Sequence, residues 1–581
     1  MKLERIDGLG YLLSDPRCEE TFTPEDFTEE QRQMAGVAEQ LARQEILPQL
    51  KAIDGQDFDA VVRLFQRCGE LGLLGVDVPE SYGGLALDKA TSALIAEKIG
   101  PTGSFAVSYM AHTGIGTLPL VYYGTPEQKE KYLPAMVSGE TPAAYCLTEP
   151  GAGSDALGAR AVATRSADGA CFALEGTKQF ITNGGFAKLY TVFARVDREH
   201  FTAFLVDRDT PGLTVGPEEK KLGIKGSSTT QIILENAQVP AGNVLGEIGK
   251  GHKIAFNVLN VGRFKLAALA LGSAKAALAE AVRYANARKQ FGKPIASFGA
   301  IREKLADMAA AAYAGESVVY RIAGLIDARL AATPADGPDH SVLVQRAIEE
   351  YAAECAIAKV YCSEALAEVA DEGLQIHGGY GYTQEYEAER YYRDERINRI
   401  FEGTNEINRL LVPVTLLRRA QAPLRDALAR ARDTLGAAVT AAAGERDALA
   451  GLKTAFLACI GAAADRLGPA LKDEQEVLLP LADIAIQIFA AESAQLRAEK
   501  ARAAGSAKSG LMQAAAKVAV FRAVECAAAA ARKAIWMAGD GEESVRLAEA
   551  VSALTRMGGI GLREARWQLA AATIENEQYP V

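Results

Sequence analysis

The sequence predicts a mainly α-helical protein with a β domain in its centre. Apolar residues recur at every third or fourth position in the first and last parts of the chain, which is typical of amphipathic helices. Between about residues 142 and 250 they alternate at every second position, with frequent Gly, Pro, Asn and Asp, as expected of strands joined by turns. A chain of 581 residues is too long for one hydrophobic core, so we expect several domains.

The first domain, residues 1–141, is predicted to be helical. The stretch 27–50 has apolar positions at helical spacing, and Thr28 followed by two glutamates is typical of a helix N-terminus. The stretches 86–100 and 125–139 repeat the pattern, and a Ser-Tyr-Gly-Gly turn signal lies before them at 81–84.

The second domain, residues 142–250, is predicted to form a mostly antiparallel sheet. Strands are expected within 170–184, 189–197, 201–209, 212–224 and 228–240.

The third domain, residues 251–415, is predicted to be an antiparallel helical bundle. Its long helical stretches are 252–292, 298–332 and 341–379, followed by the segment around Glu402. Residues 421–581 form an Ala-rich helical tail with 19 basic and 19 acidic residues, so we expect a separate, uncharged appendage.

Composition excludes several classes of function. The net charge, 63 Lys and Arg against 74 Asp and Glu, is −11, which argues against a nonspecific nucleic-acid binder. The eight cysteines lack C-x-x-C spacing and the five histidines include no pair at ligand spacing, so neither a disulfide framework nor a metal site is expected. The start of the chain lacks a signal-peptide pattern, and no stretch has eighteen uninterrupted apolar residues, so we expect a soluble, cytoplasmic protein.

One carboxylate has unusual neighbours. Glu402 follows the apolar pair Ile400-Phe401 and precedes Gly403-Thr404, a break after which a new helix is expected to begin at Glu406. Apolar neighbours raise the pKa of a carboxyl group, because burial penalises the charged form. The sequence therefore indicates a glutamate whose pKa is raised by its neighbours.

Two further stretches carry chemistry. In 143–158, Thr148 and Glu149 precede a Pro-Gly-Ala-Gly-Ser-Asp loop whose glycines would let backbone N–H groups approach a phosphate. In 178–187, Phe180 and Thr182 share one face of a strand, where they would flank a flat ring. Taken singly, these are more often a strand-ending loop and a hairpin end.

Together with residues 374–409, these two stretches resemble the acyl-CoA dehydrogenase family of flavoproteins. The order and spacing of the motifs match that family's helical domain, β domain and four-helix bundle across roughly residues 25–415. The tail, notably residues 473–496, resembles the extra C-terminal domain of the very-long-chain branch.

The resemblance implies FAD-dependent α,β-dehydrogenation of a fatty acyl-CoA to trans-2-enoyl-CoA in β-oxidation. Glu402 would abstract the α-proton and flavin N5 would accept the β-hydride. Removal of an α-proton needs a base with a pKa of about 6–7, above the ~4.3 of free glutamate. Burial beside Phe401 would supply that shift, and Gly403 would leave room for substrate. The Glu402 N–H and a ribityl hydroxyl would hold the substrate carbonyl.

By the same resemblance, the flavin contacts fall into three groups. The β domain would supply Tyr145, Leu147, Thr148, Gly153, Ser154, Phe180, Ile181 and Thr182. A neighbouring subunit would supply Arg288, Gln290, Phe291, Gln375, Ile376, Gly378 and Gly379. The segment after the base would supply Thr404, Asn405 and Glu406.

The implied substrate contacts are Ser154, Asn260, Arg263 and Gly403. A branch of the family that acts on branched chains would need an acid near Gly262, and this chain has none there, which favours a straight-chain substrate. Val107 and Ala111 stand where medium-chain relatives have larger, polar residues, and Phe298-Gly299 also resembles the very-long-chain branch. A long acyl chain is expected, although Met110 would shorten the channel.

The resemblance also implies electron-transferring flavoprotein as the redox partner and a homodimeric assembly. Two other functions stay open: an acyl-CoA oxidase, and a non-catalytic flavin-binding relative that serves in assembly or associates with DNA. The net-zero tail argues against DNA, and a retained Glu402 argues against a purely structural role. Membrane contact by the tail is possible but less favoured than packing over the bundle, because the tail lacks a dense basic face.

Overall fold

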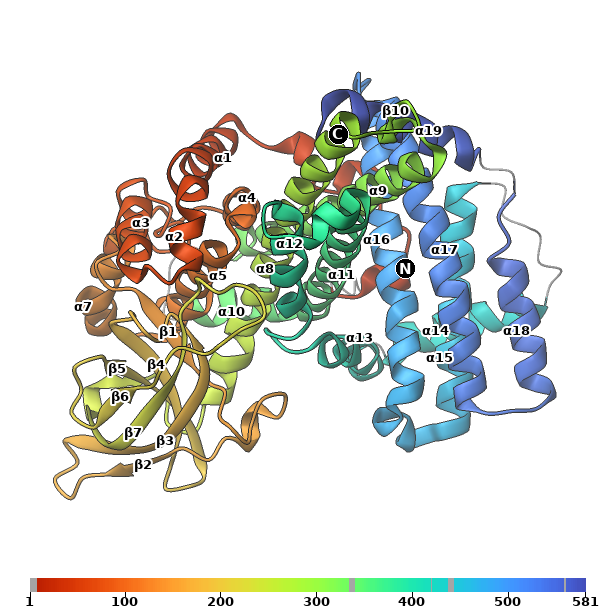
Figure 1. Ribbon diagram of the computed structural model, residues 1–581. Coiled ribbons are helices and arrows are strands. Elements are labelled where there is room, and N and C mark those ends of the chain that lie inside the picture. Colours follow the sequence, from red (N-terminus) through yellow and green to blue (C-terminus); the bar gives the residue numbers. More distant parts are fainter. Residues whose placement is uncertain (1–7, 334–339, 420, 437–443, 559–560) are drawn as a thin grey trace.

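The computed structural model describes residues 8–333, 340–419, 421–436, 444–558 and 561–581. The β sheet and the N-terminal helices lie at one side of the molecule, the long bundle helices in the middle, and the C-terminal helices at the other side (Figure 1). The helical and β domains therefore follow the predicted order. The first seven residues, on which the expectation about a leader peptide partly depended, lie outside the described chain.

The N-terminal domain is helical, as predicted. Its helices are α1 (Glu29–Leu41), α2 (Leu50–Asp54), α3 (Phe58–Glu70), α4 (Lys89–Ile99), α5 (Ser104–Ala111), α6 (Leu118–Tyr123) and α7 (Pro126–Val137). Thr28 is the N-cap of α1: its hydroxyl accepts from the Gln31 N–H at 3.2 Å, and the Gln31 side chain accepts from the Thr28 N–H at 2.9 Å. This reciprocal capping box confirms the predicted start of the helix.

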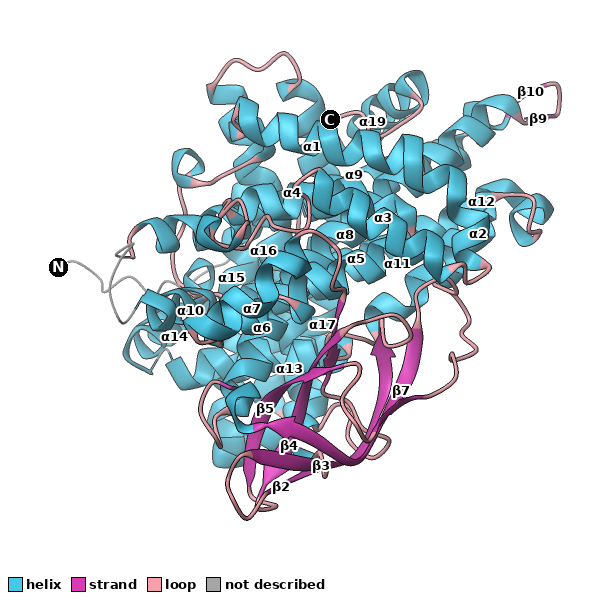
Figure 2. Ribbon diagram, turned by 90° about the vertical axis from the view of Figure 1, so that its left-hand side faces the viewer, coloured by secondary structure: helices cyan, strands magenta, loops and turns pink. Residues whose placement is uncertain are grey.

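The central domain is a single sheet that lies below most of the helices in Figure 2. Its strands are β1 (Ala143–Cys146), β2 (Val162–Arg165), β3 (Cys171–Thr182), β4 (Leu189–Val196), β5 (His200–Asp207), β6 (Leu213–Val215), β7 (Thr229–Pro240) and β8 (Val244–Leu245). The order is β6-β7-β3-β2-β4-β5-β8, with β1 beside β4. Pairing is antiparallel except that β1 and β2 both run parallel to β4. The sheet is thus mixed, because a long excursion separates β1 from its partner.

The bundle is built on four long helices. These are α8 (Gly251–Ala287), α9 (Gly299–Ala331), α11 (Ala352–His377) and α13 (Asn405–Arg419), with the shorter α10 (His340–Glu350) and α12 (Glu387–Glu395) between them. A small hairpin of β9 (Lys289–Gln290) and β10 (Lys293–Pro294) projects beyond the end of α8 (Figure 2). Helix α13 begins one residue before the predicted start, at Asn405.

The C-terminal tail forms a further helical layer. Its helices are α14 (Gln421–Gly436), α15 (Glu445–Leu467), α16 (Gln475–Ala503), α17 (Ser509–Ala538), α18 (Glu542–Leu554) and α19 (Leu562–Asn576). One hydrophobic cluster includes Tyr313 of the bundle together with Phe489 and Leu569 of the tail. The tail is therefore a further helical domain that packs over the bundle, as favoured above, and its many alanines let its helices pack closely enough to share the bundle's core.

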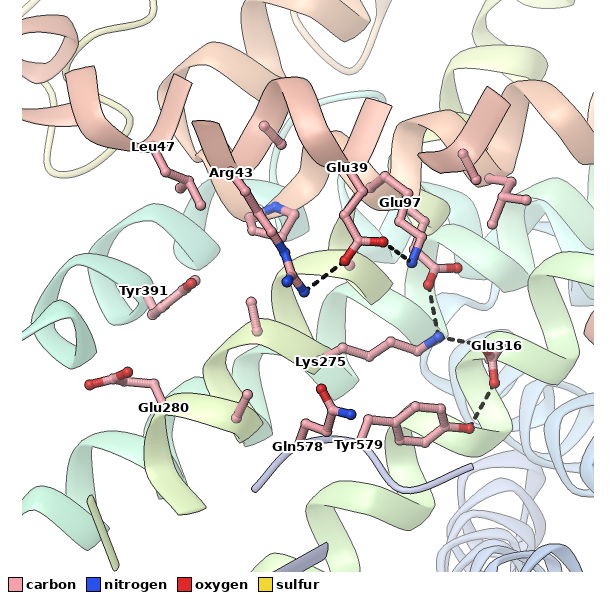
Figure 3. A pocket seen from close by; sticks show the side chains of 18 of the residues that line it. Glu39, Arg43, Leu47, Glu97, Lys275, Glu280, Glu316, Tyr391, Gln578 and Tyr579 are labelled. Carbon is pink, nitrogen blue, oxygen red and sulfur yellow. Dashed lines mark hydrogen bonds and ion pairs between the residues drawn. The ribbon is translucent and has the colours of Figure 1, made fainter. Parts of the chain in front are cut away.

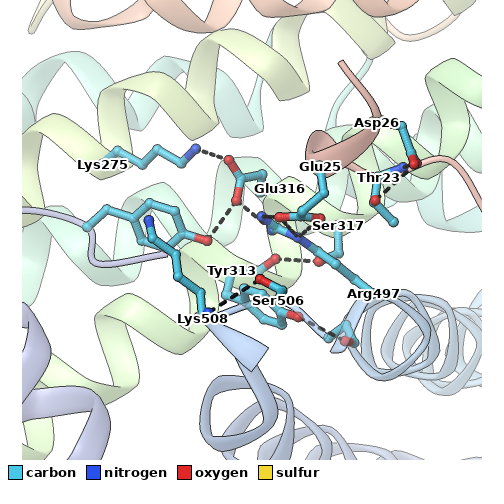
Figure 4. A network of polar contacts seen from close by, with 12 residues as sticks. Thr23, Glu25, Asp26, Lys275, Tyr313, Glu316, Ser317, Arg497, Ser506 and Lys508 are labelled. Atoms are coloured by element: carbon cyan, nitrogen blue, oxygen red, sulfur yellow. Dashed lines mark hydrogen bonds and ion pairs between the residues drawn. The ribbon is translucent and has the colours of Figure 1, made fainter. Parts of the chain in front are cut away.

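The interface between tail and bundle also contains buried charges (Figure 4). Arg497 of α16 donates to Glu316 of α9 at 2.6 Å and to Glu25, which precedes α1, at 2.7 Å. Glu316 also pairs with Lys275 of α8 and accepts from the Tyr579 hydroxyl at 2.7 Å. A buried ion pair loses its favourable energy when either partner is misplaced, so this cluster fixes how the tail sits on the bundle.

Within the part of the chain that the structure describes, three helical stretches are long and apolar enough to cross a membrane by length and composition alone: Gly251–Ala287, Glu445–Asp473 and Gln475–Ala503. In this fold, however, 83%, 72% and 83% of their most apolar windows are buried against other parts of the protein.

Candidate active site

Glu402 lies in a tight loop between α12 and α13. Its φ is +57° and that of Gly403 is +80°, so two successive residues adopt left-handed backbone. The loop carbonyls are held by interior donors: Arg263 Nε donates to Glu402 O at 3.1 Å, and Lys359 Nζ and Asn408 Nδ2 each donate to Gly403 O at 2.8 Å. A non-glycine residue persists in this conformation only when its surroundings hold it there.

The Glu402 side chain is half-buried, and one of its two carboxyl oxygens, Oε2, is fully enclosed. Its Oε2 has no partner among the described residues. It points at α8, where a Cβ added to Gly262 would lie 2.7 Å from Oε2 and 3.1 Å from Ile115 Cγ2. Burial raises the pKa of Glu402 to about 7, although the charges of Arg263 and Lys359 oppose the rise.

The shift agrees with the sequence prediction, but its cause differs in part. Phe401 packs against the core of the N-terminal domain, as expected, whereas Ile400 is 48% exposed and does not enclose the carboxyl. The close approach of Gly262 is instead what buries it. Gly403 is needed for its positive φ, because a side chain there would be strained.

The structure brings Thr148 and Phe180 together. The Gln179 N–H donates to Thr148 O at 2.9 Å, which ties the end of β1 to β3. Between Lys178 and Ile181 the β3–β7 register shifts, and Phe180 takes φ +57°. Such a bulge re-aims a side chain. Phe180 is 61% exposed and Thr182 is half-buried, while Ile181 between them is buried.

The glycine loop after β1 is anchored by Glu149. This carboxylate pairs with buried Lys178 at 2.6 Å and accepts from the N–H groups of Arg160 at 2.6 Å and Ala161 at 3.0 Å. Glu149 is therefore an anchor rather than a reactive acid. The loop beyond it presents Gly153 and Ser154 to solvent, and a Cβ added at Gly153 would meet no atom within 4 Å. A phosphate has room to approach this backbone.

Tyr145 and Leu147, at the end of β1, are each 8% exposed. The Tyr145 hydroxyl donates to Ala255 O of α8 at 3.4 Å. Burial and the nearby Glu402 charge raise the pKa of Tyr145 well above its usual value. The Tyr145 hydroxyl thus joins the end of β1 to α8, the helix that also approaches the candidate base at Gly262, so the β domain and the bundle meet there.

The second group of predicted flavin residues lies at the far end of α8. Arg288 lies over the Tyr380 ring at 5.5 Å, which joins it to the end of α11. Phe291 is 92% exposed on the hairpin, Gln290 and Gln375 are exposed, and a Cβ at Gly378 or Gly379 would meet no atom within 4 Å. Ile376 is 5% exposed, so a ligand would meet only its main chain.

The two groups do not meet within one chain. Arg263 lies within α8 and Arg288 directly follows its last residue, 25 residues further along the chain. At a rise of 1.5 Å per residue, the two are about 37 Å apart. In one chain, the Arg288 group is therefore a second surface, remote from Glu402.

Other predicted residues are committed to internal contacts. Arg263 and Asn260 are about 5% exposed and bond to each other at 3.1 Å, so they support the Glu402 loop from beneath. The Asn405 side chain bonds to Lys359 and Ser363, leaving only its main chain for a ligand. Glu406 is exposed, and the Thr404 hydroxyl accepts from the Ile407 N–H at 3.3 Å as a helix cap.

Sequence reasoning missed Lys359 and Asn408. Lys359 is fully buried, and burial lowers its pKa to about 7. The signal was a lysine inside the apolar helical run AIAKVYC, since an interior lysine needs partners. Asn408, also fully buried, gave no such signal, because an asparagine in the first turn of a helix is ordinary.

A large cavity lies elsewhere, between α1, α4, α8 and the C-terminal residues (Figure 3). It has a volume of about 920 Å³ and is lined by residues such as Glu39, Lys275 and Tyr579. Among the described residues that line it, none belongs to the predicted site.

Comparison with known proteins agrees with this geometry. Family models for the acyl-CoA dehydrogenase N-terminal, middle and C-terminal domains match residues 28–140, 144–237 and 249–417, and a further acyl-CoA dehydrogenase C-terminal domain matches 451–551. The chain belongs to the acyl-CoA dehydrogenase family. This acyl-CoA dehydrogenase therefore uses FAD, the cofactor of the family.

Three relatives illustrate the similarity. A probable acyl-CoA dehydrogenase of Bacillus subtilis is 46% identical, covering 99% of this chain and 98% of that protein. The mitochondrial very-long-chain specific acyl-CoA dehydrogenase of Mus musculus is 43% identical over 59% of this chain and 51% of its own. The crystal structure of a Bacillus anthracis acyl-CoA dehydrogenase complexed with FAD has a TM-score of 0.96 and 45% identity, covering 99% of this chain and 100% of that one.

The described residues fit FAD. An exposed aromatic ring on a strained bulge, a hydroxyl beside it, and an open glycine loop are the features that a flat ring and a phosphate require. Phe180, Thr148 and Thr182 would hold the ring, and Gly153 and Ser154 the phosphates.

We predict that Gly262→Ala lowers the rate of anaerobic flavin reduction by acyl-CoA about 100-fold. The new methyl group would fall within van der Waals contact of Glu402 Oε2 and displace it, and displacement of a catalytic group by about 1 Å has an effect of this size. Stopped-flow absorbance measures the rate. Gly36→Ala is the matched control, because a Cβ there meets no atom within 4 Å, and its rate should equal that of the wild type. Equal rates in both variants would contradict the assigned position of the carboxyl.

Proposed function

We propose that this enzyme dehydrogenates straight-chain, long-chain fatty acyl-CoA to trans-2-enoyl-CoA in β-oxidation, with Glu402 removing the α-proton. The observation that carries the proposal is the Glu402 carboxyl group, whose enclosed Oε2 has no hydrogen-bond partner among the described residues and whose pKa is raised to about 7. A general base is most effective when its pKa lies near the working pH. Bound FAD supplies the acceptor for the β-hydride.

The residues around Glu402 support this role. The hydrogen bonds of the loop go to its main-chain carbonyls, and the carboxyl oxygen Oε2 has no partner among the described residues, so this oxygen remains available to a proton. Arg263 and the protonated form of Lys359 keep the pKa of Glu402 from rising further, which preserves an ionised fraction near neutral pH. The strained loop also presents the Glu402 N–H as the donor that would polarise the substrate carbonyl.

The preference for a straight chain rests on Gly262. An acid at this position would occupy the space of the Glu402 carboxyl, so the two positions for a base exclude each other. The preference for a long chain rests on the family resemblance of Val107 and Ala111 and on the similarity to a very-long-chain specific relative. Both side chains, and that of Met110, are less than 6% exposed.

Electron-transferring flavoprotein as the acceptor and a cytoplasmic location complete the proposal. All eight cysteines are free thiols in the structure, which is consistent with a reducing compartment.

The first test is anaerobic bleaching of the flavin by butanoyl-, octanoyl- and palmitoyl-CoA. We expect bleaching to be fastest with palmitoyl-CoA, and Glu402→Gln to slow it by about 10²- to 10⁴-fold, the contribution of a general base. The exposed Glu140→Gln serves as the control and should bleach normally. Bound flavin that no acyl-CoA reduces would favour a binding or assembly role, and fastest bleaching by butanoyl-CoA would overturn the long-chain assignment.

A second test uses pH. Because the ionised carboxylate is the base, kcat/KM should be constant above about pH 7 and fall tenfold per pH unit below it. Initial rates between pH 5.5 and 9, at ~0.5-unit steps, measure the profile. Flavin absorbance retained across the range shows that folding does not cause the loss. Rates that stay constant down to pH 5.5, as the ordinary glutamate pKa of ~4.3 would give, would contradict the burial argument.

We also propose a homodimer in which the Arg288 group of one subunit completes the FAD site of the other. Support comes from the separation of about 37 Å within one chain and from the exposure of Phe291. Arg288→Met should leave a two-chain mass in sedimentation equilibrium but increase FAD loss on dilution. Arg283→Met, on the last turns of the same helix and also exposed, should retain FAD. A monomer that keeps its FAD would contradict the proposal.

A further inference from the structure

A continuous set of polar contacts leads from the Glu402 loop to the C-terminal tail. It begins at Lys359 Nζ, which donates to Gly403 O at 2.8 Å and to Asn405 Oδ1 at 2.7 Å. Lys359 and Asn405 are 0% and 3% exposed, so water does not compete for these bonds. One buried ammonium group thus holds both the loop and the first residue of α13.

The next contacts run outward from Asn405. Its Nδ2 donates to Glu364 Oε1 of α11 at 2.9 Å. Arg409 of α13 donates two hydrogen bonds to the Glu364 carboxylate, of 2.7 and 2.9 Å. The Arg409 Nε donates to Asp483 Oδ1 of α16 at 2.7 Å. A bidentate arginine–carboxylate pair fixes geometry better than a single charge contact does.

We propose that the C-terminal tail positions the catalytic loop through Asp483, by way of Arg409, Glu364, Asn405 and Lys359. This inference rests on the proposed role of Glu402. Asp483 and Arg409 are positioning residues in this proposal, since they contact neither substrate nor flavin. They act by orienting α13 and the carboxamide of Asn405, which binds the same Lys359 ammonium group as the loop does.

Two features favour positioning over simple adhesion between domains. Helix α13 begins directly after the loop and packs against α16, so a shift of the helix moves the loop with it. The loop also contains two left-handed residues, which need external support to keep their conformation. The outer contacts are partly solvated, with Arg409 18% and Asp483 41% exposed, so we expect a moderate effect.

The same interface offers a matched control. Arg522 of α17 donates to both carboxylate oxygens of Glu368 at 2.6 Å, one helical turn beyond Glu364 on α11. Both ion-pair groups line one cavity of about 160 Å³ between bundle and tail. Among its described contacts, Glu368 has none with the loop or with Asn405. Breaking this pair weakens the interface without touching the proposed connection.

The experiment compares Asp483→Asn with Glu368→Gln in the full-length, FAD-loaded enzyme. We expect Asp483→Asn to slow single-turnover flavin bleaching by palmitoyl-CoA about 2- to 30-fold, the range of measured long-range couplings. Hydrogen exchange of amides 400–408 should become faster in the same variant. Glu368→Gln should change neither, although both variants should lower the unfolding midpoint by similar amounts.

A double variant distinguishes action through one connected path from two independent structural effects. If the contacts act as one path, Asn405→Ala and Asp483→Asn together should slow bleaching less than the product of the single effects. Independent, multiplicative effects would overturn the proposal. So would equal rates and equal exchange in Asp483→Asn and Glu368→Gln.

Failure of the proposed function would look different. In that case the wild type would not bleach, or Glu402→Gln would bleach as fast as the wild type. The hydrogen exchange of amides 400–408 in Asp483→Asn would still report whether the tail holds the loop.

Discussion

The structure of the site depends on one unfavourable arrangement: a carboxyl group with one oxygen, Oε2 of Glu402, enclosed and without a hydrogen-bond donor among the described residues. Burying an ionisable group without a partner costs free energy, and the group responds by favouring its neutral form. Glu402 is held there because its backbone is well bonded, with three interior side chains on the carbonyls of Glu402 and Gly403. Stability is supplied to the main chain, so the side chain stays free to react.

Three parts of the chain must meet for this arrangement to exist. Gly262 of α8 provides the close wall, the end of β1 provides Tyr145, and the loop before α13 provides the acid. The bulge in β3 then turns Phe180 outward beside Thr148. No single element contains the site, so its accuracy depends on how firmly the domains are packed together.

The sequence predicted those features that are local. The change of period from helix to strand, the cap at Thr28 and the apolar pair before Glu402 can all be read from neighbouring residues. The parallel pairing of β1 with β4 and the burial of Glu402 by Gly262 depend on residues far apart in sequence. The role of Ile400 was wrong for the same reason: adjacency in sequence does not establish burial.

The net charge of the tail is zero, but several of its charged side chains form buried ion pairs with the bundle. Equal numbers of acids and bases suggested an uncharged appendage, yet Arg497 pairs with Glu316, and Arg321 of the bundle pairs with Glu492 of α16 at 2.9 Å, both within the interior. Alanine-rich surfaces can slide past one another with little loss of contact, because their side chains are small and alike. Buried ion pairs do not tolerate such a shift, since a misplaced partner leaves a charge unpaired in a medium of low polarity. The buried ion pairs therefore fix the position of the tail helices along the bundle helices, which the alanines leave undefined. Because that position is fixed, a contact such as Asp483–Arg409 can hold a distant loop in place.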